Sequence, residues 1–391
     1  MIDLGIMKTA AQGRPRIKEK DRFRHLYVLG KTQSGKSTFF LNLIKQEIDH
    51  AIIVLDPAGS FANSVASLAP KDRLVYVDKD NPLVLNPLRR KASRSEIANH
   101  LIEVVNNCVT GTTPSIEITV LMGEIIRNAI RVLKDNELEV DYLCDFLNYE
   151  HIRDKYHSDK YWEHFDAKER PGWYKYREKR DSALRVASRL SAFILDDNLK
   201  KFTIGDDQFS VKDIVDNKRI VCFDFRGLDN DLMLYLGNLV TTAVKFYYMH
   251  DAKYDSPPLF LYADEYHLFM SPAFNNMLAE CAKFNISVNL SHHIFKQVNE
   301  KTLNMALGNC FTKVIFSCGY EEAARMANEF QLKEKDFLNL LPYHAQIRIG
   351  NKNHLVRTYP PPAISEYQPE KQTPLSKFSF LRNSYIPYGK M

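Results

Sequence analysis

The sequence predicts an α/β protein whose mostly parallel β-sheet is flanked by helices and interrupted by an inserted all-α domain. Apolar runs typical of strands buried on both faces of a parallel sheet alternate with helical patterns in two parts of the chain. Between these parts, no convincing strand pattern occurs over residues 85–200. The predicted strands cover residues 26–29, 51–55, 73–77, 219–225, 259–263, 286–290 and 309–316, with a hairpin at 345–350 and 354–358.

The composition describes a folded protein in which two or so domains are expected. Its 391 residues include 45% hydrophobic and 26% charged types, and the net charge is +5. A mildly basic balance permits a nucleic-acid partner without requiring one. The six cysteines form no C-x-x-C pair, which predicts reduced thiols in a cytoplasmic protein. No apolar run approaches the roughly 20 residues of a membrane helix, and no signal peptide is visible.

A phosphate-binding loop follows the first predicted strand. Residues 30–38 fit the pattern G-x-x-x-x-G-K-[ST] between an apolar strand and the start of a helix, which is the context that this motif requires. Backbone N–H groups would face the phosphates at the helix N-terminus. Lys36 would reach the β- and γ-phosphates, and the Ser37 hydroxyl would hold Mg²⁺. The residues predicted to bind the nucleotide are Gly30, Lys31, Thr32, Gln33, Ser34, Gly35, Lys36, Ser37 and Thr38.

A second half of the same site is predicted at Asp264 and Glu265, directly after the apolar run 259–263. Asp264 would accept the water shell of Mg²⁺, because this hard cation prefers carboxylate oxygens. Glu265 is placed to polarise the attacking water, which predicts a hydrolase. Asp56 also ends a strand, and two interpretations stay open for it. It either approaches the metal site or a subunit interface, or it caps the helix that follows.

The chain divides into a basic arm or edge strand, two parts of a nucleotide-binding core separated by a helical insertion, and a tail. The arm is expected either to be solvated or to face DNA or another subunit. The tail is expected either to pack on its own surface or a neighbouring subunit, or to be disordered. The predicted parts cover residues 1–25, 26–90, 91–200, 201–360 and 361–391.

The helical insertion carries a basic stretch that also contains aromatic residues. Basic charge beside aromatic rings suits phosphate contact and base stacking, which makes the stretch a candidate for DNA binding. Acidic residues within it favour a solvated helix face instead. The candidate DNA contacts are Arg170, Lys175, Arg177, Lys179 and Arg180.

Several stretches follow the phosphate loop in a fixed order. Ile53 to Gly59 ends a strand, a helical insertion comes next, and residues 209–215 lead back into a strand. Ala263 to Phe269 and residues 307–316 complete the set. In this order they resemble the motifs of the FtsK–HerA superfamily of DNA-translocating ATPases, in particular those of the type IV secretion coupling proteins of the TraD/TraG branch. The likeness covers residues 22–360.

The resemblance implies a RecA-like P-loop ATPase core that forms a ring, usually a hexamer, with ATP between subunits and DNA in the central pore. It implies ATP and Mg²⁺ as cofactors. DNA, further copies of the chain, and relaxase, nuclease or secretion-system proteins are the implied partners. The expected function is an ATP-driven DNA translocase. A protein-recruiting scaffold whose ATP site drives assembly is the alternative. A nucleotide kinase is disfavoured because no lid signature is present.

The sequence departs from the family pattern at several positions. Gln33 stands where the loop usually has glycine, and His292 stands where the family often has a glutamine that senses the γ-phosphate. Lys313 occupies the expected position of an arginine that acts on the neighbouring subunit's site, with Arg325 and Arg348 as rivals. The membrane helices of coupling proteins and the N-terminal barrel of HerA have no counterpart in this sequence.

Overall fold

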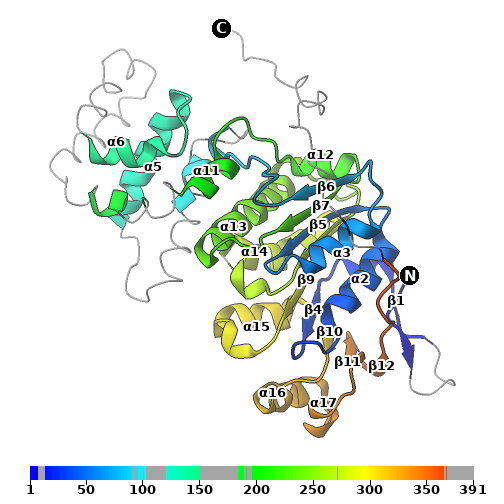
Figure 1. Ribbon diagram of the computed structural model, residues 1–391. Coiled ribbons are helices and arrows are strands. Elements are labelled where there is room, and N and C mark those ends of the chain that lie inside the picture. The colour runs from blue at the N-terminus through cyan, green and yellow to red at the C-terminus, as the bar shows by residue number, and fades with distance from the viewer. Residues whose placement is uncertain are drawn as a thin grey trace.

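A computed structural model confirms the predicted fold class, with one large sheet between layers of helices (Figure 1). The structure describes residues 1–7, 14–89, 93, 95–99, 101–102, 120–149, 184–188, 191, 196–270, 272–364 and 367. The strands are β1 (Ile2–Asp3), β2 (Ile6–Met7), β3 (Arg16–Ile17), β4 (Leu26–Leu29), β5 (Ala51–Asp56), β6 (Leu74–Val77), β7 (Ile220–Asp224), β8 (Leu259–Ala263), β9 (Ile286–His292), β10 (Thr312–Ile315), β11 (His344–Ile349) and β12 (Lys352–Arg357).

The main sheet has ten strands in the order β2-β12-β11-β10-β4-β9-β8-β5-β7-β6, and β1 pairs with β3 in a separate ribbon. The strands from β10 to β6 run parallel, and β11, β12 and β2 extend the sheet in antiparallel fashion. Every residue of β4, β5, β7, β8 and β9 is buried. Their burial on both faces explains the continuous apolar runs in the sequence. Ligand-binding residues are expected at the carboxyl ends of these strands.

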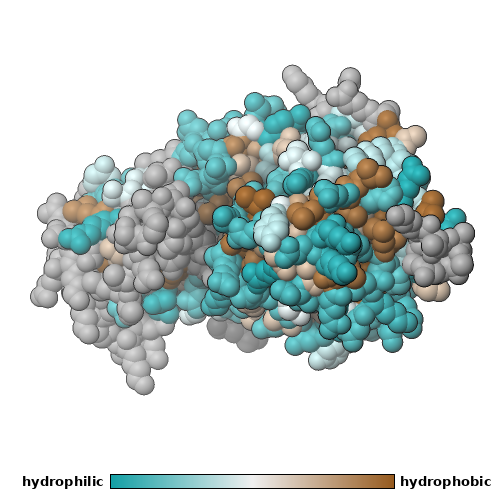
Figure 2. All heavy atoms as spheres, turned by 90° about the horizontal axis from the view of Figure 1, so that it is seen from below, coloured by the Kyte–Doolittle hydropathy of each residue, from teal (hydrophilic) through white to brown (hydrophobic). Residues whose placement is uncertain are grey.

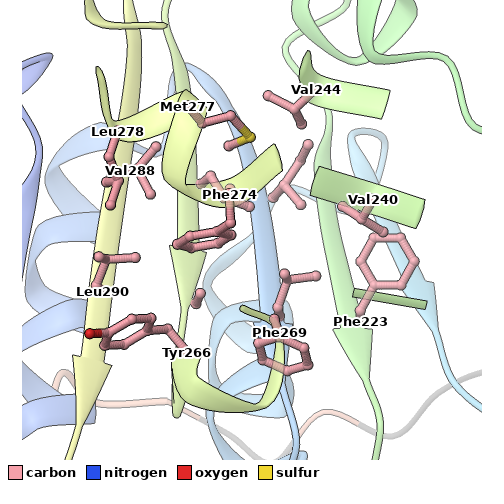
Figure 3. Close-up of a cluster of buried hydrophobic side chains, with 14 of the residues drawn as sticks. Phe223, Val240, Val244, Tyr266, Phe269, Phe274, Met277, Leu278, Val288 and Leu290 are labelled. Atoms are coloured by element: carbon pink, nitrogen blue, oxygen red, sulfur yellow. The ribbon is translucent and has the colours of Figure 1, made fainter. Parts of the chain in front are cut away.

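Helices cover both faces of the sheet. α2 and α3 pack on one face, and α13 to α16 pack on the other. Figure 3 shows the second layer, where Phe274 and Met277 of α14 lie in one hydrophobic cluster with Val288 and Leu290 of β9. The helices are α1 (Glu19–Arg22), α2 (Lys36–Glu47), α3 (Ser60–Leu68), α5 (Val120–Asp135), α6 (Tyr142–Asn148), α11 (Asp197–Thr203), α12 (Val211–Asp216), α13 (Asn230–Phe246), α14 (Pro272–Glu280), α15 (Glu300–Asn309), α16 (Tyr320–Phe330) and α17 (Lys335–Leu338).

The helical insertion has a hydrophobic cluster of its own, formed largely by α5 and α6. These helices lie to one side of the sheet, with α11 between them and the core (Figure 1). A capping box forms at the start of the insertion, where the Ser93 N–H donates to Glu96 (2.9 Å) and the Glu96 N–H donates to the Ser93 hydroxyl (3.2 Å). The predicted domain boundaries themselves stay a proposal.

The N-terminal segment supplies an edge strand, β2, which pairs with β12. One of its basic residues is not available to solvent, DNA or another subunit. The Arg22 side chain is 1% exposed, and its Nε donates to Glu47 of α2 at 2.6 Å. Its other nitrogens donate to Ser287 and Tyr262, so the guanidinium ties α1 to α2, β8 and β9.

Beyond β12 the chain returns across the helices of the first face. The Asn42 amide of α2 donates to the carbonyls of Tyr359 (3.3 Å) and Pro360 (3.0 Å). Tyr367 packs on Tyr76 with a ring separation of 5.2 Å. This beginning of the predicted tail therefore packs on the chain's own surface, and most of residues 361–391 lie outside the described part.

The surface seen in Figure 2 is mainly hydrophilic, with hydrophobic residues in small groups between charged and polar ones. Within the described residues, no helix combines the length and the apolar character needed to span a bilayer.

Candidate nucleotide site

The phosphate loop joins β4 to α2 through a turn that two residues make in the left-handed region. Gln33 has a φ of 61° and Gly35 a φ of 117°, and α2 begins at Lys36. Glycine adopts such angles without strain, whereas glutamine does so at a cost. The family's usual glycine at the position of Gln33 is thus explained, and the loop keeps its shape here despite the substitution. Gly30 has no space for a side chain, because an added Cβ would lie 2.6 Å from Cβ of Phe316.

Lys36 is folded back onto its own loop. Its Nζ donates to the carbonyls of Gly30 (2.8 Å) and Lys31 (3.3 Å) and lies 2.8 Å from Nδ1 of His293. Burial lowers the pKa of the Lys36 ammonium, and the carboxylates of Glu265 and Asp264 oppose that effect. The ammonium is therefore held next to the N-terminus of α2, where phosphate groups bind.

Ser37 and Asp264 form a pair of oxygen donors at the start of α2. The Ser37 hydroxyl donates to the Asp264 carboxylate at 3.3 Å, and Ser291 donates to the other carboxylate oxygen. Burial raises the pKa of Asp264, and the hydrogen bond from Ser291 works in the opposite direction. A hydroxyl and a carboxylate facing one another fit Mg²⁺, which takes oxygen ligands together with substrate phosphates. These residues would hold the cation, which would supply positive charge to the phosphates.

Glu265 directly follows Asp264 and has a strained backbone conformation, with a φ of 49°. Its Oε1 accepts a hydrogen bond from Nε2 of His293 at 2.6 Å. Nδ1 of His267 lies 3.4 Å from Oε2 of Glu265, yet neither of these two buried atoms makes a hydrogen bond. One carboxylate oxygen of Glu265 thus has no hydrogen-bond partner among the described residues.

His293 connects the lysine of the loop with the carboxylate of Glu265. Its Nε2 donates to Glu265, which raises the pKa of the imidazole most, while partial burial and the charge of Lys36 lower it. With the proton on Nε2, Nδ1 accepts from Lys36. The backbone N–H of His293 donates to the Gln297 side chain (3.2 Å), which steadies the end of β9.

The structure places His292, the predicted γ-phosphate sensor, away from the phosphate loop. His292 is fully buried, bonds to the Tyr27 hydroxyl and lies 3.1 Å from the Ile294 carbonyl. Burial lowers the pKa of its imidazole to about 3. Because side chains alternate along a strand, Ser291 and His293 share the face that carries the site, and His292 points into the core. His293, one position further along the chain, is the histidine that contacts Lys36 and Glu265, and the sequence analysis did not single it out.

Lys313 does not lie in the site of its own chain. Its ammonium pairs with Glu329 of α16 at 2.8 Å, and its side chain is 11% exposed. Its rivals are also occupied, since Arg325 donates to Asn304 and Arg348 donates to the Gly350 carbonyl. An action of any of the three on a neighbouring subunit stays a prediction. The candidate DNA contacts in residues 170–180 lie outside the described residues.

Of the two interpretations of Asp56, the structure favours a helix cap. Its carboxylate accepts from the N–H groups of Ala58 and Ala62, both at 2.9 Å, and so serves the first turn of α3. Burial raises the pKa of Asp56 to about 6. Both carboxylate oxygens of Asp56 thus accept hydrogen bonds from the start of α3.

A phosphate loop after β4 and an Asp-Glu pair after β8 of a parallel sheet define the class of protein, which is a P-loop ATPase. The family described as the central domain of helicase HerA matches residues 17–244, more than half of the 391 residues. The chain belongs to this family. No curated protein matches the chain.

Solved structures share the fold at low sequence identity. The bacterial conjugative coupling protein TrwBdeltaN70, in an unbound form, is 13% identical and has a TM-score of 0.67, with 93% of this chain and 90% of that chain covered. VirB4 of Thermoanaerobacter pseudethanolicus is 14% identical and has a TM-score of 0.64, with 92% and 96% covered. TrwB in complex with ADP and Mg²⁺ is 13% identical and has a TM-score of 0.63, with 92% and 88% covered. Its ligands match the ATP and Mg²⁺ predicted from this sequence.

Proposed function

We propose that this protein is an ATP-driven motor that moves DNA and that hydrolyses ATP between the subunits of a ring. The observation that carries the proposal is the placement of Glu265. Its carboxylate stands beside the phosphate loop, one residue after Asp264, and bonds to His293. This arrangement occurs in a chain of the HerA family, whose solved structural neighbours include a conjugative coupling protein.

The proposal gives each residue of the site a task that its geometry supports. Lys36 exchanges the carbonyls of Gly30 and Lys31 for phosphate oxygens, because an anion attracts the ammonium more strongly than a carbonyl does. Glu265 polarises the attacking water through its unpaired oxygen. His293 lies within reach of both groups, so it is placed to sense the γ-phosphate and to release Glu265 when that phosphate binds.

The ring is proposed because the described residues bring no arginine to the site. In the described part of the chain, no arginine forms a hydrogen bond or an ion pair with Lys36, Asp264 or Glu265. Charge on a transferring phosphoryl group is commonly stabilised by an arginine from a neighbouring subunit. A ring with ATP between subunits would supply that cation and leave a central pore for DNA. The five free cysteines among the described residues are all buried, which supports a reducing compartment, and we propose that the protein works in the cytoplasm.

The proposal is tested by measuring ATPase activity with and without DNA at low salt. DNA should stimulate the activity, and the stimulation should fall as salt rises, because phosphate contacts release counterions. Lys36→Ala should abolish nucleotide binding, and Glu265→Gln should bind ATP without hydrolysing it. Glu265→Gln with full turnover would refute the role of Glu265. ATPase activity that DNA leaves unchanged would refute translocation and favour a protein-recruiting scaffold.

A further inference from the structure

Tyr343 is an aromatic residue at the phosphate loop that the proposed chemistry does not use. It precedes β11, and its ring lies against Gly35, where an added Cβ would meet Tyr343 Cδ1 at 3.0 Å. The residue is 36% exposed, and Leu341 beside it is 67% exposed. We propose that Tyr343 is the platform on which the base of the bound nucleotide stacks. This inference rests on the proposed function, because it concerns the other end of the same nucleotide.

The sheet order places Tyr343 at the base end of the site. Glu265 and His293 come from β8 and β9, on one side of β4, and they mark where the γ-phosphate reacts. β11 lies on the opposite side of β4, beyond β10, and it runs antiparallel, so its first residues meet the carboxyl ends of the parallel strands. A triphosphate with its γ-phosphate at Glu265 thus extends along the loop toward Tyr343.

The backbone holds Tyr343 firmly in an unfavourable conformation. Its φ is 62°, in the left-handed region that aromatic residues rarely adopt. Its N–H donates to the Ser34 carbonyl of the phosphate loop at 3.0 Å, and its own carbonyl accepts from the Thr358 N–H at 2.7 Å and from the Thr358 hydroxyl at 3.1 Å. Strained residues of this kind persist where the surrounding structure fixes them, commonly at ligand sites. Here the bonds place the ring beside the loop before any nucleotide binds.

An exposed ring fixed beside a phosphate site suits a flat heterocycle. Every nucleobase has a π-face, so stacking on Tyr343 contributes affinity without selecting one base. The proposal therefore predicts that the ring raises the affinity for adenine and guanine nucleotides equally. It should not raise the affinity for tripolyphosphate, which has no base.

The test compares Tyr343→Phe and Tyr343→Gly with the wild-type protein. Glycine tolerates the left-handed φ, so the fold should keep its thermal stability while the ring is lost. Dissociation constants for ATP and GTP in the presence of Mg²⁺ should rise about tenfold in Tyr343→Gly, as expected for the loss of one stacked ring, and should be unchanged in Tyr343→Phe. The inhibition constant of tripolyphosphate, corrected for competition with ATP, should be equal in all three proteins. Tyr254→Ala is the matched control. Tyr254 is 74% exposed and lies at the amino ends of β8 and β9, at the edge of the sheet opposite to the nucleotide site.

Two results would overturn the inference. Tyr343→Gly could bind ATP as tightly as the wild type, or it could lose ATP and tripolyphosphate to the same extent, which would show a damaged loop rather than a missing platform. Failure of the wild-type protein to bind ATP would instead refute the proposed function, so the two failures are distinguishable.

Discussion

His293 lies between a cation and an anion, and this position makes it the side chain whose loss should affect hydrolysis most selectively. It contacts Lys36 at 2.8 Å and Glu265 at 2.6 Å. In His293→Ala we expect kcat to fall about 100-fold, in the range of groups that assist proton transfer or its positioning. The dissociation constant for ATP should change little, because the loop and Lys36 remain. Single-turnover hydrolysis and equilibrium binding measure the two quantities separately.

His292 provides the matched control for that experiment. It is buried against Tyr27 and Tyr266, away from the loop. His292→Ala should lower the free energy of unfolding by about 1–3 kcal/mol, since the buried Tyr27 hydroxyl loses a partner, and should leave kcat of the folded protein unchanged. Loss of hydrolysis in His292→Ala with normal activity in His293→Ala would reinstate His292 as the sensor.

His25 makes stability depend on pH through its burial. Burial lowers the pKa of its imidazole to about 4, and its Nδ1 accepts from the Val288 N–H at 3.1 Å. Below the unfolded pKa of about 6.5, the unfolded state takes up a proton that the folded state refuses, so stability falls as pH drops from 6.5 toward 4. His25→Asn keeps an acceptor and tolerates the φ of 61°. When pH drops from 7.5 to 5.5, the wild type should lose about 1.4 kcal/mol more unfolding free energy than the variant, as measured by urea unfolding. A constant difference between the two proteins would contradict this assignment.

At the scale of elements, the Arg22–Glu47 pair joins α1 to α2 inside the protein. Both side chains are almost fully buried, at 1% and 2% exposure. Arg22→Met should destabilise the fold by about 3–5 kcal/mol, because Glu47 would remain as an unpaired buried charge. The double variant Arg22→Met/Glu47→Leu should recover most of that loss. Chemical denaturation of the single and double variants gives the coupling energy, and additive losses would show that the two charges are not coupled.

The strands of the parallel sheet could be predicted because burial on both faces leaves a long apolar run in the sequence. The end of β9 could not be predicted, and for this reason the sequence analysis named His292 and not His293 as the sensor. The apolar run stops at Leu290, whereas the strand continues through Ser291 to His292. Since alternate residues face opposite sides, a shift of one residue exchanges the core face for the site face. Periodicity alone could not show that Ser291 contacts Asp264.

Helix α15 was not predicted for a related reason. Residues 300–309 contain asparagine, threonine and glycine, and their apolar residues give a weak helical pattern. The helix forms because its Asn299 cap accepts from the Thr302 N–H (2.9 Å), and because Leu303, Ala306 and Leu307 belong to the hydrophobic core that α14 also joins. Tertiary packing therefore stabilises α15, whose sequence has a low intrinsic helix propensity.

At the scale of the whole molecule, the sheet gathers the predicted catalytic groups from distant parts of the sequence. The loop after β4, Asp264 after β8 and His293 after β9 meet because three parallel strands end at one edge. The phosphate loop and the Asp-Glu pair were predictable from motifs that fix their own local geometry. Tyr343 was not, since it lies outside any motif and reaches the site only through the antiparallel extension of the sheet.

No arginine among the described residues bonds to Lys36, Asp264 or Glu265, and this leads to a prediction about assembly. If a cation from the neighbouring subunit completes the site, specific ATPase activity should rise with protein concentration until the ring is fully formed. Lys36→Ala has no functional loop but keeps its donor residue, and a donor variant keeps its loop. The donor variants to compare are Lys313→Ala, Arg325→Ala and Arg348→Ala. An inactive donor variant should regain part of its activity when it is mixed with Lys36→Ala. Some interfaces would then combine the intact phosphate loop of the donor variant with the intact donor residue of Lys36→Ala.

The three donor variants separate the candidates for that role. Lys313 has to leave Glu329 to reach a neighbour. Arg325 and Arg348 are half-exposed, and they donate to an asparagine side chain and to a carbonyl, respectively. The variant that loses activity alone, and recovers it only when mixed with Lys36→Ala, identifies the donor. Specific activity that stays constant on dilution to a demonstrated monomer would show that one chain holds the complete site and would refute the shared interface.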